Sequence, residues 1–111
     1  MFRLVLVTCL FATPVLAAES KEKSCGYQGQ VMSAVQKARL DKVKEADVAA
    51  TIAASNPPWP ANYSAAIPQL TQFVYSQKMR DLRKNDLGAS LRAQCIENWD
   101  QIQKMQKNLK N

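Results

Sequence analysis

Histidine is absent from this chain of 111 residues. Its absence removes the commonest general base and the commonest metal ligand in proteins. No Ser-His-Asp or Cys-His catalytic arrangement can be built, and cysteines that pair with each other leave no thiolate for zinc. We therefore expect a protein that is not an enzyme and that holds no metal or other cofactor.

Glycine and strand-like patterns are also scarce. The chain has only three glycines, and no window alternates β-branched and polar residues. Apolar residues recur instead at spacings of three and four, which is typical of helices. The pattern predicts an all-α fold.

Long hydrophobic runs are missing as well. The longest, residues 4–16, is shorter than the roughly 20 residues of a membrane span. Arg3 precedes it and Ala17 follows it, as in a secretory signal peptide. Cys9 offers a lipoprotein alternative, but Thr8 stands where a small residue is expected. We expect a signal peptide at 1–17, a single domain at 18–111 with a flexible lead-in at 18–24, no stable membrane insertion, and a periplasmic or secreted location.

Two of the three cysteines follow this leader, Cys25 and Cys95. An exported chain with one available pair is typical of a single-disulfide protein. Closing so long a loop stabilises a fold by about 4 kcal/mol in the chain-entropy model.

The helical pattern divides into four segments, which we predict as a small four-helix bundle whose disulfide joins the first and last helices. Ser24 is the expected N-cap of the first helix, and Glu45 and Asp47 favour the start of the second through the helix dipole. The expected helices span residues 25–40, 44–55, 64–79 and 87–109.

A proline-rich connector lies at residues 55–63 and carries Trp59 and Tyr63. Its prolines exclude a helix and favour an extended, stiff conformation. The two aromatic side chains would form a flat platform for a sugar, peptide or aliphatic ligand. The alternative, which we favour, is that Trp59 folds back as a lid over a small core.

The charged stretch 78–86 contains Arg80 and Arg83, three positions apart. On a helix they would share a face and bind phosphate or carboxylate groups of a partner. We favour the simpler interpretation, a solvated connection in which acidic and basic neighbours pair locally.

Other charged residues are less specific. Glu97 with Asp100, and Glu45 with Asp47, lack the apolar shielding that an acid/base pair needs, so a carboxylate-dependent cell-wall hydrolase is the least favoured hypothesis. The net charge of +6 is spread along the chain, which is typical of solubility rather than nucleic-acid binding.

Several short motifs are spread through residues 25–95: Cys25-Gly26-Tyr27, Ala38-Arg39, Pro57-Pro58-Trp59-Pro60, Tyr63, Ile67-Pro68, Val74-Tyr75, Arg80-Asp81-Leu82-Arg83 and Cys95. Together they resemble small secreted two-cysteine helical proteins of proteobacteria. The resemblance implies a periplasmic location and no mechanism.

Two functional groups have a similar build. The tail at 98–104 is similar to the end of acid-stress chaperones of the periplasm, and the architecture resembles immunity proteins that block cell-wall amidase toxins. Architecture alone is a poor guide to function. We expect a non-enzymatic periplasmic binding or protective protein, first of all a stress-type acid chaperone that binds unfolded clients. The alternative is an immunity or inhibitor protein with one partner, such as a cell-wall hydrolase.

Overall fold

The computed structural model describes residues 20–109. The predicted signal peptide, residues 1–17, lies outside this part. The described chain is helical and contains no strand, which confirms the predicted all-α class. Its α-helices are α1 (Lys21–Leu40), α2 (Val48–Ala54), α3 (Ile67–Tyr75), α4 (Met79–Lys84), α5 (Leu87–Glu97) and α6 (Trp99–Leu109), with short 3-10 helices η1 (Glu45–Asp47) and η2 (Ala61–Ala66).

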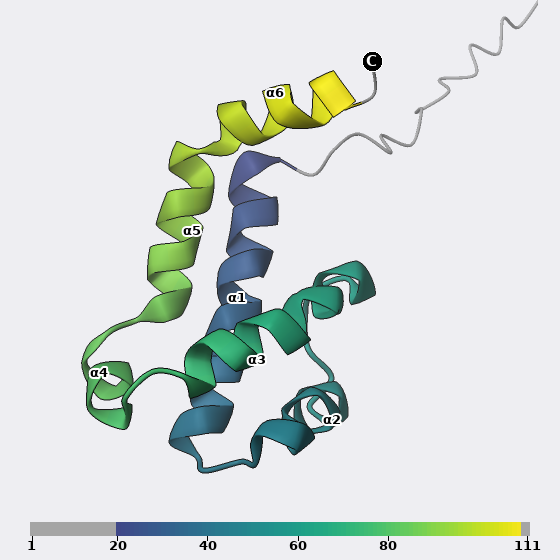
Figure 1. The fold of residues 1–111 in the computed structure, drawn as a ribbon. Coiled ribbons are helices and arrows are strands. Elements are labelled where there is room, and N and C mark those ends of the chain that lie inside the picture. The colour runs from purple at the N-terminus through teal and green to yellow at the C-terminus, as the bar shows by residue number, and fades with distance from the viewer. Residues whose placement is uncertain (1–19, 110–111) are drawn as a thin grey trace, which may run out of the picture.

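Helix α1 is the element around which α2, α3, α4 and α5 pack. α5 runs along its first half, whereas α2, α3 and α4 surround its second half (Figure 1). The core lies where these helices meet α1, and its buried side chains are Val31, Met32, Val35, Ala38, Val48, Ile52, Trp59, Ile67, Val74 and Leu82.

α1 begins earlier than the sequence pattern predicts. It starts at Lys21, so residues 21–24 of the expected lead-in are helical. Ser20 is its N-cap, because its hydroxyl accepts a hydrogen bond from the backbone N–H of Lys23 at 3.3 Å. Ser24, the predicted cap, is buried inside the helix and accepts a hydrogen bond from the Tyr63 hydroxyl.

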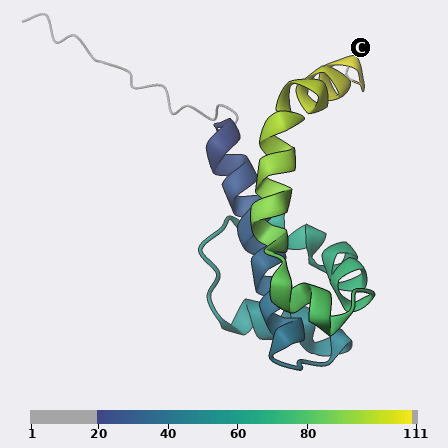
Figure 2. The ribbon, with the colours of Figure 1, turned by 90° about the vertical axis from the view of Figure 1, so that its left-hand side faces the viewer.

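The last predicted helix, residues 87–109, is divided at Asn98. There the backbone leaves the helical conformation, and α6 leaves α5 at an angle (Figure 2). Asparagine favours helix ends because its short polar side chain competes for backbone hydrogen bonds. The prediction of one continuous helix here is therefore wrong.

Cys25 and Cys95 form the predicted disulfide between α1 and α5, with their Cα atoms 5.5 Å apart. Both cysteines are buried. The bond closes a loop across 70 positions of the chain, which corresponds to a stabilisation of about 4 kcal/mol.

Near this bond the two helices cross with almost no side chain between them. A Cβ atom at Gly29 would lie 2.8 Å from the carbonyl oxygen of Gly88, and one at Gly88 would lie 2.6 Å from that of Gly29. Ser33 Oγ would be 1.9 Å from the added atom at Gly88. These two glycines therefore set the distance between the helices. Gly26, by contrast, has room for a Cβ atom, which would lie at an ordinary contact distance of 4.0 Å from Arg92 Nε.

After the disulfide and the glycine contact, a third connection joins α1 to the junction between α4 and α5. It is made by the buried side chain of Gln36. Its amide nitrogen donates to the carbonyl oxygens of Leu82, at 2.7 Å, and Asn85, at 2.6 Å. Its amide oxygen accepts from the N–H of Leu87 at 3.1 Å. One amide thus satisfies carbonyls at the end of α4 and an N–H at the start of α5, which helix ends leave unpaired. This explains why a six-residue helix forms where the sequence predicts a solvated connection.

The glycine contact predicts opposite effects at two nearby positions. Gly88→Ala should lower the free energy of unfolding by about 1–3 kcal/mol, because the helices must move apart. Gly26→Ala should raise it by up to about 1 kcal/mol, because alanine favours the helix and its methyl group clashes with no neighbour. Urea unfolding of both variants measures the difference; equal effects would contradict the close contact.

The Gln36 contacts predict a stability loss that depends on pH. In Gln36→Glu an ionised carboxylate faces two carbonyl oxygens, which should cost about 3 kcal/mol or more near neutral pH. This environment raises the pKa of the new carboxyl group above its unfolded value, so the loss should shrink as pH falls through the folded pKa.

Denaturant titrations from pH 4 to 7 measure this dependence. Gln30→Glu, at an exposed position of the same helix, is the matched control and should show little loss at any pH. A Gln36→Glu variant as stable as the wild type at pH 7 would show that the amide is not needed.

Candidate functional site

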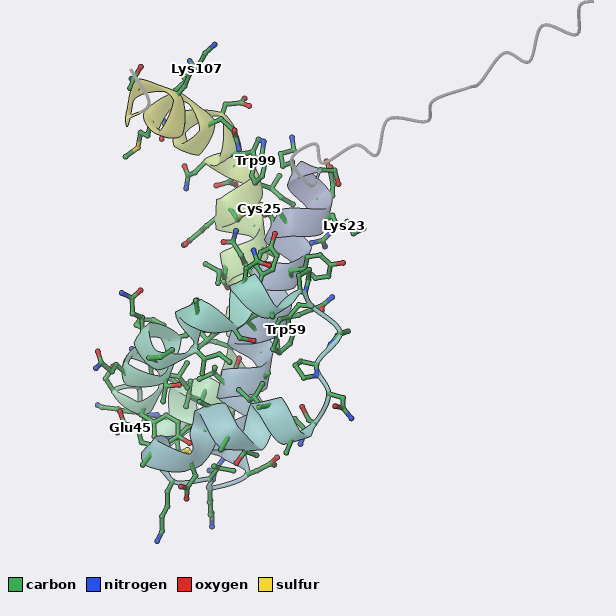
Figure 3. All side chains as sticks on the ribbon, turned by 90° about the vertical axis from the view of Figure 1, so that its right-hand side faces the viewer. Lys23, Cys25, Glu45, Trp59, Trp99 and Lys107 are labelled. Carbon is green, nitrogen blue, oxygen red and sulfur yellow. A yellow bond between two sulfur atoms is a disulfide. The ribbon has the colours of Figure 1, made fainter. Side chains whose placement is uncertain are left out.

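Trp59 lies in the core. Its side chain is 8% exposed, and Figure 3 shows it beside α1. The indole N–H donates to Ser64 Oγ at 2.9 Å, so burial leaves its polar atom satisfied. The structure therefore places Trp59 as a lid, the arrangement that the sequence favours, and leaves little of the ring for a ligand.

Tyr63 lies close to Trp59 in sequence but in a different environment. Its ring packs against Tyr27, with centroids 5.2 Å apart, and its hydroxyl donates to Ser24 Oγ at 3.0 Å. These contacts tie η2 to the first turns of α1. The residue is half-buried, so it contributes to a surface as well as to the fold.

Arg80 and Arg83 are both exposed on α4. The side chain of Arg80 is 73% exposed, and its Nε lies 4.0 Å from the carboxylate of the adjacent Asp81. Such an exposed pair contributes little. Leu82, which lies between the two arginines in sequence, is buried and anchors the helix to the core. The pair is thus displayed on a short helix, whereas Trp59 is buried in the core and Tyr63 packs against Tyr27 of α1.

Neither acidic pair lies in an apolar environment. Glu97 ends α5 and Asp100 lies in the first turn of α6, whereas Glu45 and Asp47 form η1; all four are exposed. Within residues 20–109 no three His, Cys, Asp or Glu side chains gather as they would around a metal ion.

The fold perturbs the titration of Tyr75. Burial raises the pKa of its hydroxyl; the nearby charge of Arg39 opposes this rise and Glu45 adds to it. The Arg39 guanidinium lies over the ring, 4.9 Å from its centroid, and the hydroxyl donates to the carbonyl of Val43. The neutral phenol thus fastens the turn after α1 to α3.

One hollow is a mostly apolar groove that the sequence does not reveal. It has a volume of about 530 Å³ and lies between α1, η2, α3 and α5. Its lining, which we call the α1–η2 groove, consists of Gln28, Val31, Asn62, Tyr63, Ala65, Ala66, Leu70 and Leu91. None of these side chains is charged, and most of the lining is carbon.

Small side chains keep this groove open. Ala65 and Ala66 form one wall and are exposed, whereas Val31 is completely buried in the floor. Leu70 and Leu91, which also line the groove, are half-buried, and Gln28 and Asn62 add amide groups. The groove can therefore hold an apolar segment with a few hydrogen bonds along it. In the sequence, only the pair Ala65-Ala66 hints at the groove. Composition alone does not distinguish such a pair from alanines that simply favour a helix.

Comparison with known proteins finds no match to this chain among family models, curated proteins or solved structures. The resemblance to two-cysteine secreted proteins therefore stays a prediction. None of the helices in residues 20–109 is long and apolar enough to cross a membrane.

The burial of Trp59 predicts that its replacement lowers the stability of the fold. Trp59→Ala should lower the free energy of unfolding by about 3–5 kcal/mol, as for other large buried aromatic side chains. Trp59→Phe keeps most of the ring but loses the bond to Ser64, and should cost about 1 kcal/mol from that bond. Thermal unfolding measures both; a fully stable Trp59→Ala protein would show that the ring is a surface platform instead.

Proposed function

We propose that this protein is a non-enzymatic protective protein, located outside the cytoplasm, that holds apolar segments of other polypeptides in the α1–η2 groove. The observation that carries the proposal is the uncharged lining of that groove and its volume of about 530 Å³. A cavity of this size suits a few apolar side chains. A lining without charged residues can accept apolar segments of many different sequences. A protein that binds unfolded clients needs this lack of selectivity.

The disulfide supports both the location and the mechanism. Disulfides persist in oxidising compartments such as the periplasm. Cys25 lies three positions before Gln28, and Cys95 four positions after Leu91, so the covalent bond joins two walls of the groove. The groove is thereby held open without a bound client.

The distribution of carboxylates bears on how binding is controlled. The ion pairs in the described residues are exposed, Lys37 with Asp41 at 2.6 Å and Arg80 with Asp81 at 4.0 Å. Protonating exposed partners removes little stability. Asp86 caps α5 through the N–H of Ala89, and losing a cap costs about 1 kcal/mol. The fold therefore supports a groove that already works at neutral pH, rather than one that acid unfolding must expose.

A charge placed in the groove tests this proposal. Ala65→Glu adds a carboxylate at an exposed position of the wall, which an apolar client segment would have to desolvate. Client binding should weaken about tenfold, which corresponds to roughly 1.4 kcal/mol. The matched control is Ala53→Glu, which makes the same change at an exposed alanine of α2 that does not line the groove.

The assay is suppression of aggregation of a chemically denatured client at pH 7 and near pH 3. Suppression at pH 7 that Ala65→Glu reduces and Ala53→Glu preserves supports the proposal. Suppression that appears only near pH 3, equally in both variants, would replace it with an acid-triggered chaperone. One stoichiometric complex from periplasmic extract, without client suppression, would instead support the immunity or inhibitor alternative, with Arg80 and Arg83 as its first candidates for mutation.

A further inference from the structure

Helix α6 stands apart from the body of the molecule. It packs on the end of α5 and projects from it in both ribbon views (Figures 1 and 2). Met105 is 65% exposed, which makes it the most exposed large apolar side chain in the described part of the chain. A helix of 11 residues is only marginally stable in water without a packing partner. α6 therefore presents at least one large apolar side chain, Met105, that the rest of the protein leaves largely uncovered.

The two sides of α6 differ in chemistry. Apolar residues occur at positions 99, 102, 105 and 109, a spacing that a helix gathers on one side. Lys104 and Lys107 are exposed and fall on the other side, together with Asp100. The helix is thus amphipathic, with low average hydrophobicity and more positive than negative charge. This is the composition of helices that lie in the surface of a bilayer rather than across it.

Two further features favour a lipid surface. Trp99, half-buried, stands where α6 leaves α5, and tryptophan prefers the boundary between water and lipid. Lys23, near the start of α1, lies at the same end of the molecule as Trp99 and Lys107 (Figure 3), and the whole chain carries a net charge of +6. We propose that α6 is an interfacial helix that binds the protein to an anionic lipid bilayer, with its apolar side in the headgroup region.

A second copy of the chain is a poorer fit to the same surface. A helix of 11 residues is about 16 Å long, so one side of it offers far less than the roughly 800 Å² per partner of a stable interface. Two copies with the same positive charge also repel each other. A fluid bilayer needs neither shape complementarity nor a large contact, and its anionic lipids attract Lys104 and Lys107.

The test is sedimentation of the exported, full-length processed protein with vesicles. Vesicles of phosphatidylcholine with about one third phosphatidylglycerol should bind it, and phosphatidylcholine alone should bind it more weakly. Met105→Glu should weaken binding roughly tenfold or more, because an apolar contact is replaced by a charge. Lys104→Gln and Lys107→Gln should each weaken it about fivefold, and added salt should remove this difference.

Phe73→Glu is the matched control, because Phe73 is 48% exposed on α3, far from α6 in the fold. It should bind vesicles like the wild type, and circular dichroism should show the same helix content for all variants. Failure to bind the anionic vesicles, or equal losses in Met105→Glu and Phe73→Glu, would overturn the proposal. So would a dimer in sedimentation velocity that Met105→Glu dissociates without any effect on vesicles. None of these results depends on client binding in the α1–η2 groove.

Discussion

The close contact between α1 and α5 is the constraint on which the rest of the structure depends. Three different interactions hold these helices along their length: the disulfide at Cys25, the backbone contact at Gly29, and the hydrogen bonds of Gln36. They follow one another at intervals of one and two helical turns of α1. The covalent bond restricts the unfolded chain, the glycines set the separation, and the amide fixes where α5 begins. Small domains bury too little surface to rely on packing alone, so each contribution matters.

Two of the three glycines serve this contact rather than the ends of helices. A residue just past a helix end often adopts a left-handed conformation, for which glycine is the usual choice. Here Lys42 and Asn56 take that role after α1 and α2, with φ of 62° and 52°. The N–H groups of Lys42 and Val43 bond to the carbonyls of Arg39 and Ala38, closing the end of α1. Gly29 and Gly88 stand instead where a Cβ atom would prevent the helices from meeting.

Features that depend on composition and periodicity were predictable from the sequence, whereas those that depend on spatial contacts were not. The all-α class follows from helical spacing, and the Cys25–Cys95 pairing from the cysteine count. The break at Asn98 escaped prediction because the apolar rhythm continues through it. Likewise, α4 exists because Gln36, more than forty positions away, satisfies its last carbonyls. The groove could not be predicted because its lining comes from separate parts of the chain. Ala65 and Ala66 form it together with residues of α1 and α5 that are distant in sequence.

The disulfide also separates the two surfaces that we assign to binding. Leu91 lines the groove, Cys95 follows it one turn later, and α5 ends at Glu97, beyond which α6 projects. Because the disulfide fixes Cys95 to α1, a movement of α6 is not transmitted along α5 to Leu91 in the groove. From Leu91 to Asn98 the helix rises about 10 Å, so a protein held on lipid by α6 keeps its groove close to the bilayer yet outside it. Apolar segments of polypeptides that emerge near a membrane would then meet the groove where their concentration is greatest.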